Sequence, residues 1–119
     1  MSRILPTIVE TIAFARRAKK LLTADEHDDL LLYLSIYYAA GDEIPGTGGV
    51  RKLRYATGGR GKSGGMRVIY YFFDEENPLL ALYLYGKNEQ GNLTPAEKRL
   101  ATSLAAAMKA EAKARKVKR

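Results

Sequence analysis

Residues 50–85, VRKLRYATGGRGKSGGMRVIYYFFDEENPLLALYLY, decide the fold of this 119-residue chain. The stretch contains three runs of β-branched, aromatic and aliphatic residues, Val50–Tyr55, Met66–Phe73 and Leu79–Tyr85, separated by glycine-rich and polar segments. Runs of this composition between turn residues predict β-strands. Since the connections between them are short, we expect the three strands to lie antiparallel to their neighbours.

Two helices are predicted before this sheet. The first has apolar residues at helical spacing, at Ile12, Ala15, Ala18 and Leu22. Thr23 and Glu26 form a capping-box sequence, which predicts that a second helix begins there. Gly41 is expected to end that helix after about Ala40. The second helix has an apolar stripe at Leu30, Leu31, Leu34 and Tyr38.

One further helix is predicted after the sheet. Thr94-Pro95-Ala96-Glu97 is a second capping box, and we expect its apolar face to be Leu100, Leu104 and Met108. Residues 109–119 predict either a frayed helix end or a disordered basic tail. With an extended piece at Thr7–Glu10, the order (β)ααβββα predicts a single α+β domain over residues 1–108, followed by the basic tail at 109–119.

The composition excludes several classes of protein. There is no cysteine and only one histidine, His27, which excludes disulfides, thiolate chemistry and a catalytic histidine pair. A solvated His27 is favoured over a metal ligand, and no cofactor or metal is expected. No apolar run approaches the roughly 18 residues of a membrane span. The N-terminus lacks a secretion signal, so we expect a cytoplasmic protein.

The formal net charge of +7 is concentrated in two segments. Residues 50–73 contain six basic residues and no acid, and residues 108–119 contain six basic residues and one acid. The remaining segments, 1–49 and 74–107, are each net negative by two charges. Clustered cations of this kind are typical of proteins that bind a polyanion.

The alternation of side chains along a strand places part of the basic segment 50–73 on one face of the sheet. With Leu53 toward the helices, Lys52 and Arg54 lie together on the opposite face. Residues 66–73 are apolar on both faces, so the pattern leaves open whether Arg67 joins them. A cationic sheet face with nearby tyrosines is a recurrent RNA-binding surface. The alternative is a solvated face with ordinary salt bridges, which the lack of acids in residues 50–73 disfavours.

The glycine-rich segment 58–65 is not a phosphate-binding loop. It contains Gly-Lys-Ser, but Ala56 stands where that motif needs a glycine, and a strand follows instead of a helix. A basic hairpin loop, in which Arg60 and Lys62 follow a phosphate backbone, is the favoured interpretation.

Five segments together resemble one known family. Their residues are Gly41–Pro45, Gly46–Arg54, Gly59–Tyr71, Tyr85–Glu89 and Leu93–Thr94. The sequence resembles the RelE/ParE superfamily of bacterial type II toxins, most closely the HigB-like toxins. The resemblance implies a RelE-like microbial RNase fold, in which helices from both ends of the chain pack on a small antiparallel sheet. It also implies a ribosome-dependent mRNA endonuclease neutralised by a HigA-like antitoxin with a helix-turn-helix.

The resemblance implies catalytic cations at Lys52, Arg54, Arg67 and Lys87. Gly86-Lys87-Asn88 stands where the family has Gly-Lys-Arg. We expect metal-independent cleavage through attack by the 2′-hydroxyl. Lysine then has to act as general acid or base, while arginines stabilise the transition state. Further RNA contacts are expected from Arg51, Arg60, Lys62, Tyr70, Tyr85 and Asn88.

Two alternative functions remain open. One is a ParE-like inhibitor of DNA gyrase, which belongs to the same superfamily but does not require catalytic cations on the sheet. The other is an RNA-binding module without catalytic activity. Both predict that no new mRNA ends form in the presence of ribosomes.

Overall fold

A computed structural model describes residues 5–56, 65–86, 89 and 91–117. The protein is α+β, as the sequence predicted. Its elements, in chain order, are β1 (Ile8–Glu10), α1 (Ile12–Leu21), α2 (Ala24–Ile36), β2 (Asp42–Glu43), β3 (Val50–Tyr55), β4 (Met66–Tyr71), β5 (Leu79–Tyr85) and α3 (Pro95–Val117).

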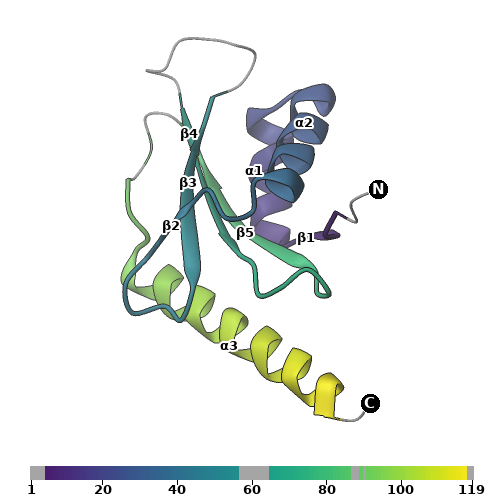
Figure 1. The fold of residues 1–119 in the computed structure, drawn as a ribbon. Helices are drawn as coiled ribbons and strands as arrows, with labels where there is room; N and C mark the ends of the chain where they lie inside the picture. The colour runs from purple at the N-terminus through teal and green to yellow at the C-terminus, as the bar shows by residue number, and fades with distance from the viewer. Residues whose placement is uncertain (1–4, 57–64, 87–88, 90, 118–119) are drawn as a thin grey trace.

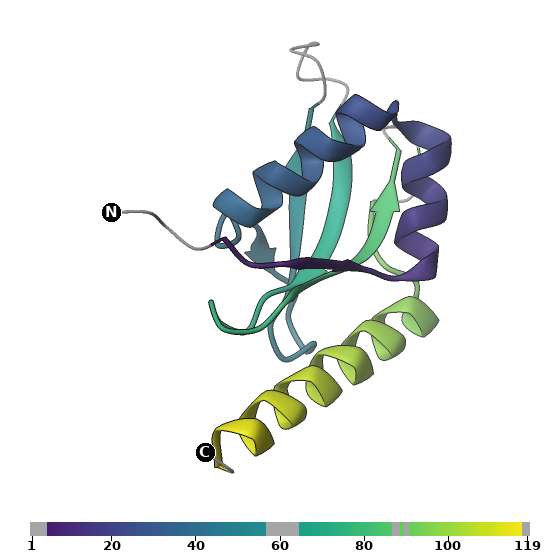
Figure 2. The same ribbon diagram turned by 90° about the vertical axis from the view of Figure 1, so that its right-hand side faces the viewer.

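The strands form one five-stranded sheet in the order β1-β5-β4-β3-β2. The pairs β3–β4 and β4–β5 are antiparallel, which confirms the prediction for these three strands. β1 adds a parallel edge strand beside β5, and the two-residue strand β2 pairs antiparallel with β3. In Figures 1 and 2, α1 and α2 cover one face of the sheet and α3 crosses the other.

Both faces of the sheet are apolar because helices cover both. Leu53, Val68 and Tyr70 pack in the core under α1 and α2. Val50 and Ile69 pack in a second core, with Ala101 and Ala105 of α3. This arrangement explains why the sequence pattern of β4 left its core-facing side open.

The apolar face of α1 differs from the prediction. Phe14 and Ala18 are fully buried, whereas Ile12 is 73% exposed and Ala15 is exposed. Thr11 fixes this rotation, because its hydroxyl accepts a hydrogen bond from Phe14 N and donates one to Leu82 O in β5. The helix is therefore held by its N-cap with the larger side chain, Phe14, in the core.

The predicted start of α2 is confirmed, but its predicted end is wrong. Thr23 and Glu26 form both hydrogen bonds of a capping box. The helix ends at Ile36, not near Ala40. The buried Tyr70 hydroxyl donates to Tyr38 O and accepts from Gly41 N, so the chain is drawn toward β4 before Gly41.

α3 packs through small residues. The capping box at its start is confirmed. The expected face at Leu100 is wrong, because Leu100 is 52% exposed; Leu104 and Met108 are partly buried. The fully buried positions of α3 are Ala101, Ala105 and Ala112, whose small size allows close approach to the sheet.

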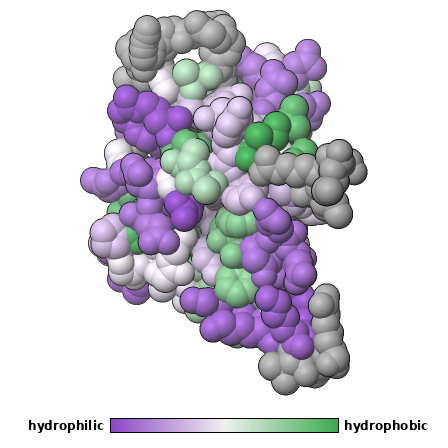
Figure 3. Space-filling view, in the orientation of Figure 1, coloured by the Kyte–Doolittle hydropathy of each residue, from purple (hydrophilic) through white to green (hydrophobic). Residues whose placement is uncertain are grey.

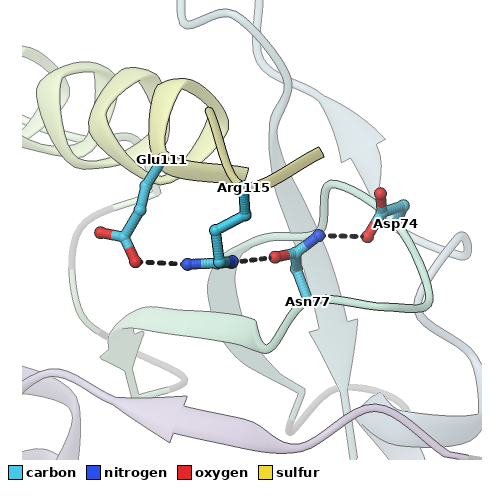
Figure 4. Close-up of polar contacts among 4 residues, drawn as sticks. All are labelled: Asp74, Asn77, Glu111 and Arg115. Carbon is cyan, nitrogen blue, oxygen red and sulfur yellow. Dashed lines mark hydrogen bonds and ion pairs between the residues drawn. The ribbon is translucent and has the colours of Figure 1, made fainter. Parts of the chain in front are cut away.

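The C-terminal part of α3 is helical through Val117 and is tied to the turn between β4 and β5. Figure 4 shows Arg115 between Glu111 and Asn77, with both of which it forms hydrogen bonds. Asn77 in turn donates to Asp74 Oδ1 at 2.6 Å. These contacts account for an ordered helix where the sequence left a tail as one of two possibilities.

Candidate nucleic-acid interface

Three cations converge on the sheet face that α3 crosses. Lys52 and Arg54 share the face of Val50, and Arg67 shares the face of Ile69. Arg54 and Arg67 are direct partners in the β3–β4 register. With Asp42 and Gly91, these cations line a hollow of about 390 Å³, which we call the cationic pocket. The structure thus brings Arg67 together with Lys52 and Arg54.

Gly65 determines where the Arg54 side chain runs. A Cβ atom at Gly65 would lie 2.5 Å from Arg54 Cγ and 2.9 Å from Cδ. Arg67 donates from its guanidinium to Gly65 O at 3.1 Å. The same glycine therefore gives space to one guanidinium side chain and orients the other.

Lys52 is held by the connection between β5 and α3. Its Nζ donates to Gly91 O and to Asn92 Oδ1, both at 3.2 Å. On its other side, Lys52 is paired in register with Asp42 of β2. The ammonium group is therefore positioned by the connection between β5 and α3, while the backbone of Lys52 is paired with β2.

Tyr85 lies beside Arg67 in the β4–β5 register and is buried. Its hydroxyl has no hydrogen-bond partner of good geometry among the described residues. Burial and the adjacent Glu97 carboxylate raise the pKa of this phenol. The Glu97 carboxylate is held beside Tyr85 by the α3 capping box, in which it accepts a hydrogen bond from Thr94 N. Tyr85 thus remains neutral at physiological pH.

Glu89 holds the other end of the connection between β5 and α3, where it leaves β5. Its carboxylate accepts a hydrogen bond from Gly86 N at 2.5 Å and forms an ion pair with Arg17 of α1. These two contacts, the backbone hydrogen bond first, lower the pKa of Glu89. The start of the β5–α3 connection is therefore tied to the helical layer.

The remaining predicted contacts lie elsewhere. Arg51 is on the opposite sheet face, where its guanidinium donates to Gly41 O at 2.6 Å. Tyr70 is fully buried on that face, beneath α1 and α2. The other predicted residues lie outside the described part of the chain: Arg60, Lys62, Lys87 and Asn88.

Sequence reasoning missed several residues around the cationic pocket. The sequence gives only one signal for the role of Gly65 beside Arg54 and Arg67, which is its place in a glycine-rich segment. Asn92 and Glu97 carry no signal beyond a polar loop and a capping box, since their contacts span long separations in sequence. Their positions depend on how α3 returns across the sheet.

His27 lies away from the cationic pocket. Its Nε2 is 2.8 Å from Glu10 Oε1, which links α2 to β1. No group of three or more potential metal-ligating side chains gathers within the described ranges. No helix in the described part of the chain is long and apolar enough to cross a membrane.

The fold and the pocket define the class: a small α+β protein with a mixed sheet, helices on both of its faces, and a cluster of cations on the face that α3 crosses. A family model described as the RelE toxin of the RelE/RelB toxin–antitoxin system matches residues 7–119. The chain belongs to the RelE toxin family, and it is a toxin that pairs with an antitoxin.

Proposed function

We propose that this toxin is a ribosome-dependent mRNA endonuclease and that the cationic pocket is its active site. The observation that carries the proposal is the convergence of Lys52, Arg54 and Arg67 on one hollow. Arg54 and Arg67 stand directly opposite each other, and like charges in that position destabilise a sheet. An anion between them removes the repulsion, so a phosphate is the ligand that this arrangement favours.

Cleavage requires two proton transfers and the stabilisation of charge. The 2′-hydroxyl loses its proton as O2′ bonds to phosphorus, the bond from phosphorus to O5′ breaks, and O5′ receives a proton. Lys52 is proposed as a proton-transfer group, acting as general acid or base. The guanidinium groups of Arg54 and Arg67 stabilise the negative charge that develops on the phosphate oxygens. Lys87, outside the described residues, is proposed as a phosphate contact or the second proton-transfer group.

Tyr85 has a supporting role in this proposal. Because its hydroxyl is buried and its pKa is raised, it does not supply a phenolate base. Tyr85 is paired with Arg67 in the β4–β5 register, and the Tyr83 ring stacks beside the Tyr85 ring at 6.2 Å between centroids. The proton-transfer role therefore falls to lysine.

The proposal includes its partners and place of action. A HigA-like antitoxin with a helix-turn-helix is the proposed partner, and ribosome-bound mRNA in the cytoplasm is the proposed substrate. The HigB-like subtype is part of the same proposal. It is supported by the Gly46–Arg54 and Gly59–Tyr71 segments.

Primer extension on mRNA in a purified translation system tests the activity. Wild-type protein is expected to produce new 5′ ends only when ribosomes are present. Lys52→Ala is expected to lower the cleavage rate by about 10²–10⁴-fold, and Arg67→Ala by about 10²–10³-fold. Lys19→Ala, which removes an exposed cation of α1, is the matched control and is expected to cleave at the wild-type rate.

Two results would contradict the proposal. A Lys52→Ala variant that cleaves as fast as wild type would remove Lys52 from the chemistry. Pulse labelling after induction provides the second test, because an mRNA endonuclease stops protein synthesis first. Loss of DNA synthesis before protein synthesis would instead identify a gyrase inhibitor.

A further inference from the structure

A second cationic hollow lies against α3. In Figures 1 and 2, the loop that joins β2 to β3 runs beside the N-terminal half of α3. Between them is a hollow of about 480 Å³, which we call the α3 groove. Its lining contains two cations, two hydroxyl groups and no carboxylate: Gly46, Pro95, Lys98, Arg99, Thr102 and Ser103.

The β2–β3 loop forms a rigid wall of this groove. Thr47 is buried, and its hydroxyl donates to Ile44 O at 2.6 Å and accepts from Val50 N at 3.1 Å. Gly46 and Gly48 have φ values of 79° and 75°, which favour glycine. Among the described residues, neither glycine N–H has a hydrogen-bond partner. Turns of this kind present backbone N–H groups to anions.

The cations of α3 lie close to this turn. A Cβ atom at Gly46 would be 3.5 Å from Lys98 Nζ, so the ammonium group lies over the turn. Lys109 lines another hollow of about 510 Å³, which shares Gly46 with the α3 groove and contains one carboxylate, Glu43. Within the described ranges, Lys98, Arg99 and Lys109 take part in no ion pair.

These cations are spaced along the helix. Lys98 and Lys109 are three turns apart on nearly the same side of α3, or about 16 Å at 1.5 Å per residue. Thr102, which also lines the α3 groove, lies between them on this side of the helix. Figure 3 shows that hydrophilic side chains continue over the C-terminal half of α3. The surface is therefore extended, polar and positively charged.

We propose that the α3 groove and Lys109 form a second RNA-binding surface, which holds backbone phosphates without reading base sequence. RNA fits better than a protein partner because no large apolar side chain lines the groove, and protein interfaces depend on such anchors. The surface also begins next to the cationic pocket, because α3 starts three residues after Asn92, which contacts Lys52. The inference extends the proposed function by giving RNA a binding surface outside the active site.

The salt dependence of RNA binding tests this surface. The probe is a fluorescein-labelled 20-nucleotide 2′-O-methyl RNA, which the proposed reaction cannot cleave. Its affinity is measured by anisotropy between 50 and 300 mM NaCl. Each lost phosphate contact lowers the slope of log K against log[salt] by about 0.7 for a single strand. Lys98→Gln/Arg99→Gln/Lys109→Gln is therefore expected to lower the slope by about 2, with weaker binding at low salt.

A matched triple variant on α1 provides the control. Arg16→Gln/Lys19→Gln/Lys20→Gln removes the same charge from exposed positions and is expected to keep the wild-type slope. An unchanged slope in the α3 variant, or an equal loss in both, would overturn the proposal. The single variants Arg99→Gln and Lys109→Gln, each expected to lower the slope by about 0.7, cover the case of a poorly folded triple variant. Because the readout is binding, it stands apart from the cleavage test of Lys52→Ala.

Discussion

Gly65→Ala tests whether the position of one guanidinium group controls cleavage. The new Cβ atom would lie 2.5 Å from Arg54 Cγ, whereas ordinary contacts are 3.4–4 Å. Arg54 must therefore move by about 1 Å or more. Gly65 has no positive φ, so the substitution does not strain the backbone itself. The substitution should therefore change the direction of the Arg54 side chain.

The expected loss follows from that displacement. A shift of about 1 Å in a positioned group costs up to about 10²-fold in rate. We expect Gly65→Ala to cleave ribosome-bound mRNA about 10- to 100-fold more slowly than wild type. Arg54 is exposed and can swing outward, so the free energy of unfolding should change by less than about 1 kcal/mol.

Gly91→Ala is the matched control for this prediction. Gly91 lines the same cationic pocket, but a Cβ atom there would meet nothing within 4 Å. Its cleavage rate and its denaturant midpoint should stay near the wild-type values. Equal cleavage by Gly65→Ala and Gly91→Ala, with both variants folded, would refute the role given to the position of Arg54.

Three further predictions concern stability. Tyr70→Phe removes the two buried hydrogen bonds of this hydroxyl, from Gly41 N and to Tyr38 O, and should cost roughly 2–3 kcal/mol in urea unfolding, while the exposed Tyr37→Phe costs almost nothing. The folded state lowers the pKa of Glu89, so its contribution to stability is complete above the ordinary value of 4.5 and is lost as the pH falls from there through the lower pKa of the folded state. The difference in melting temperature between wild type and Glu89→Gln should accordingly shrink on acidification, and a difference that grows would contradict this. Arg115→Ala should speed hydrogen exchange in the last turns of α3 and cost about 1 kcal/mol, and unchanged exchange would show that the Arg115 contacts are not what holds the helix end.

The sequence predicted strands well because their patterns are local. β3 and β5 have the predicted bounds, and β4 ends two residues earlier than expected. The grouping of Lys52 with Arg54 also follows from alternation along one strand. Arg67 could not be assigned because the apolar residues on its face are covered by α3, an element more than 25 residues away in sequence.

The helices were predicted less well where tertiary contacts determine which residues are buried and where the helix ends. In α3, the larger Leu100 predicted the wrong face, whereas the buried positions are the small Ala101 and Ala105. Hydrophobic size is a poor guide where a helix lies close to a sheet. The early end of α2 likewise depends on the Tyr70 hydroxyl, which no local pattern in residues 24–41 indicates.

The net charge of +7 is unevenly distributed over the structure. α1 and α2 together carry four cations and four acids, so the helical layer contributes no net charge. The whole excess lies on the rest of the chain, and there Lys52, Arg54 and Arg67 share the sheet face that α3 crosses. The cations that line hollows on this side come from separate parts of the chain: Lys52, Arg54 and Arg67 from the strands, and Lys98, Arg99 and Lys109 from α3. This side of the protein therefore offers positive charge to more than one phosphate of an RNA. Substitutions in the α3 groove and at Lys109 should weaken RNA binding, whereas substitutions in the cationic pocket should slow cleavage.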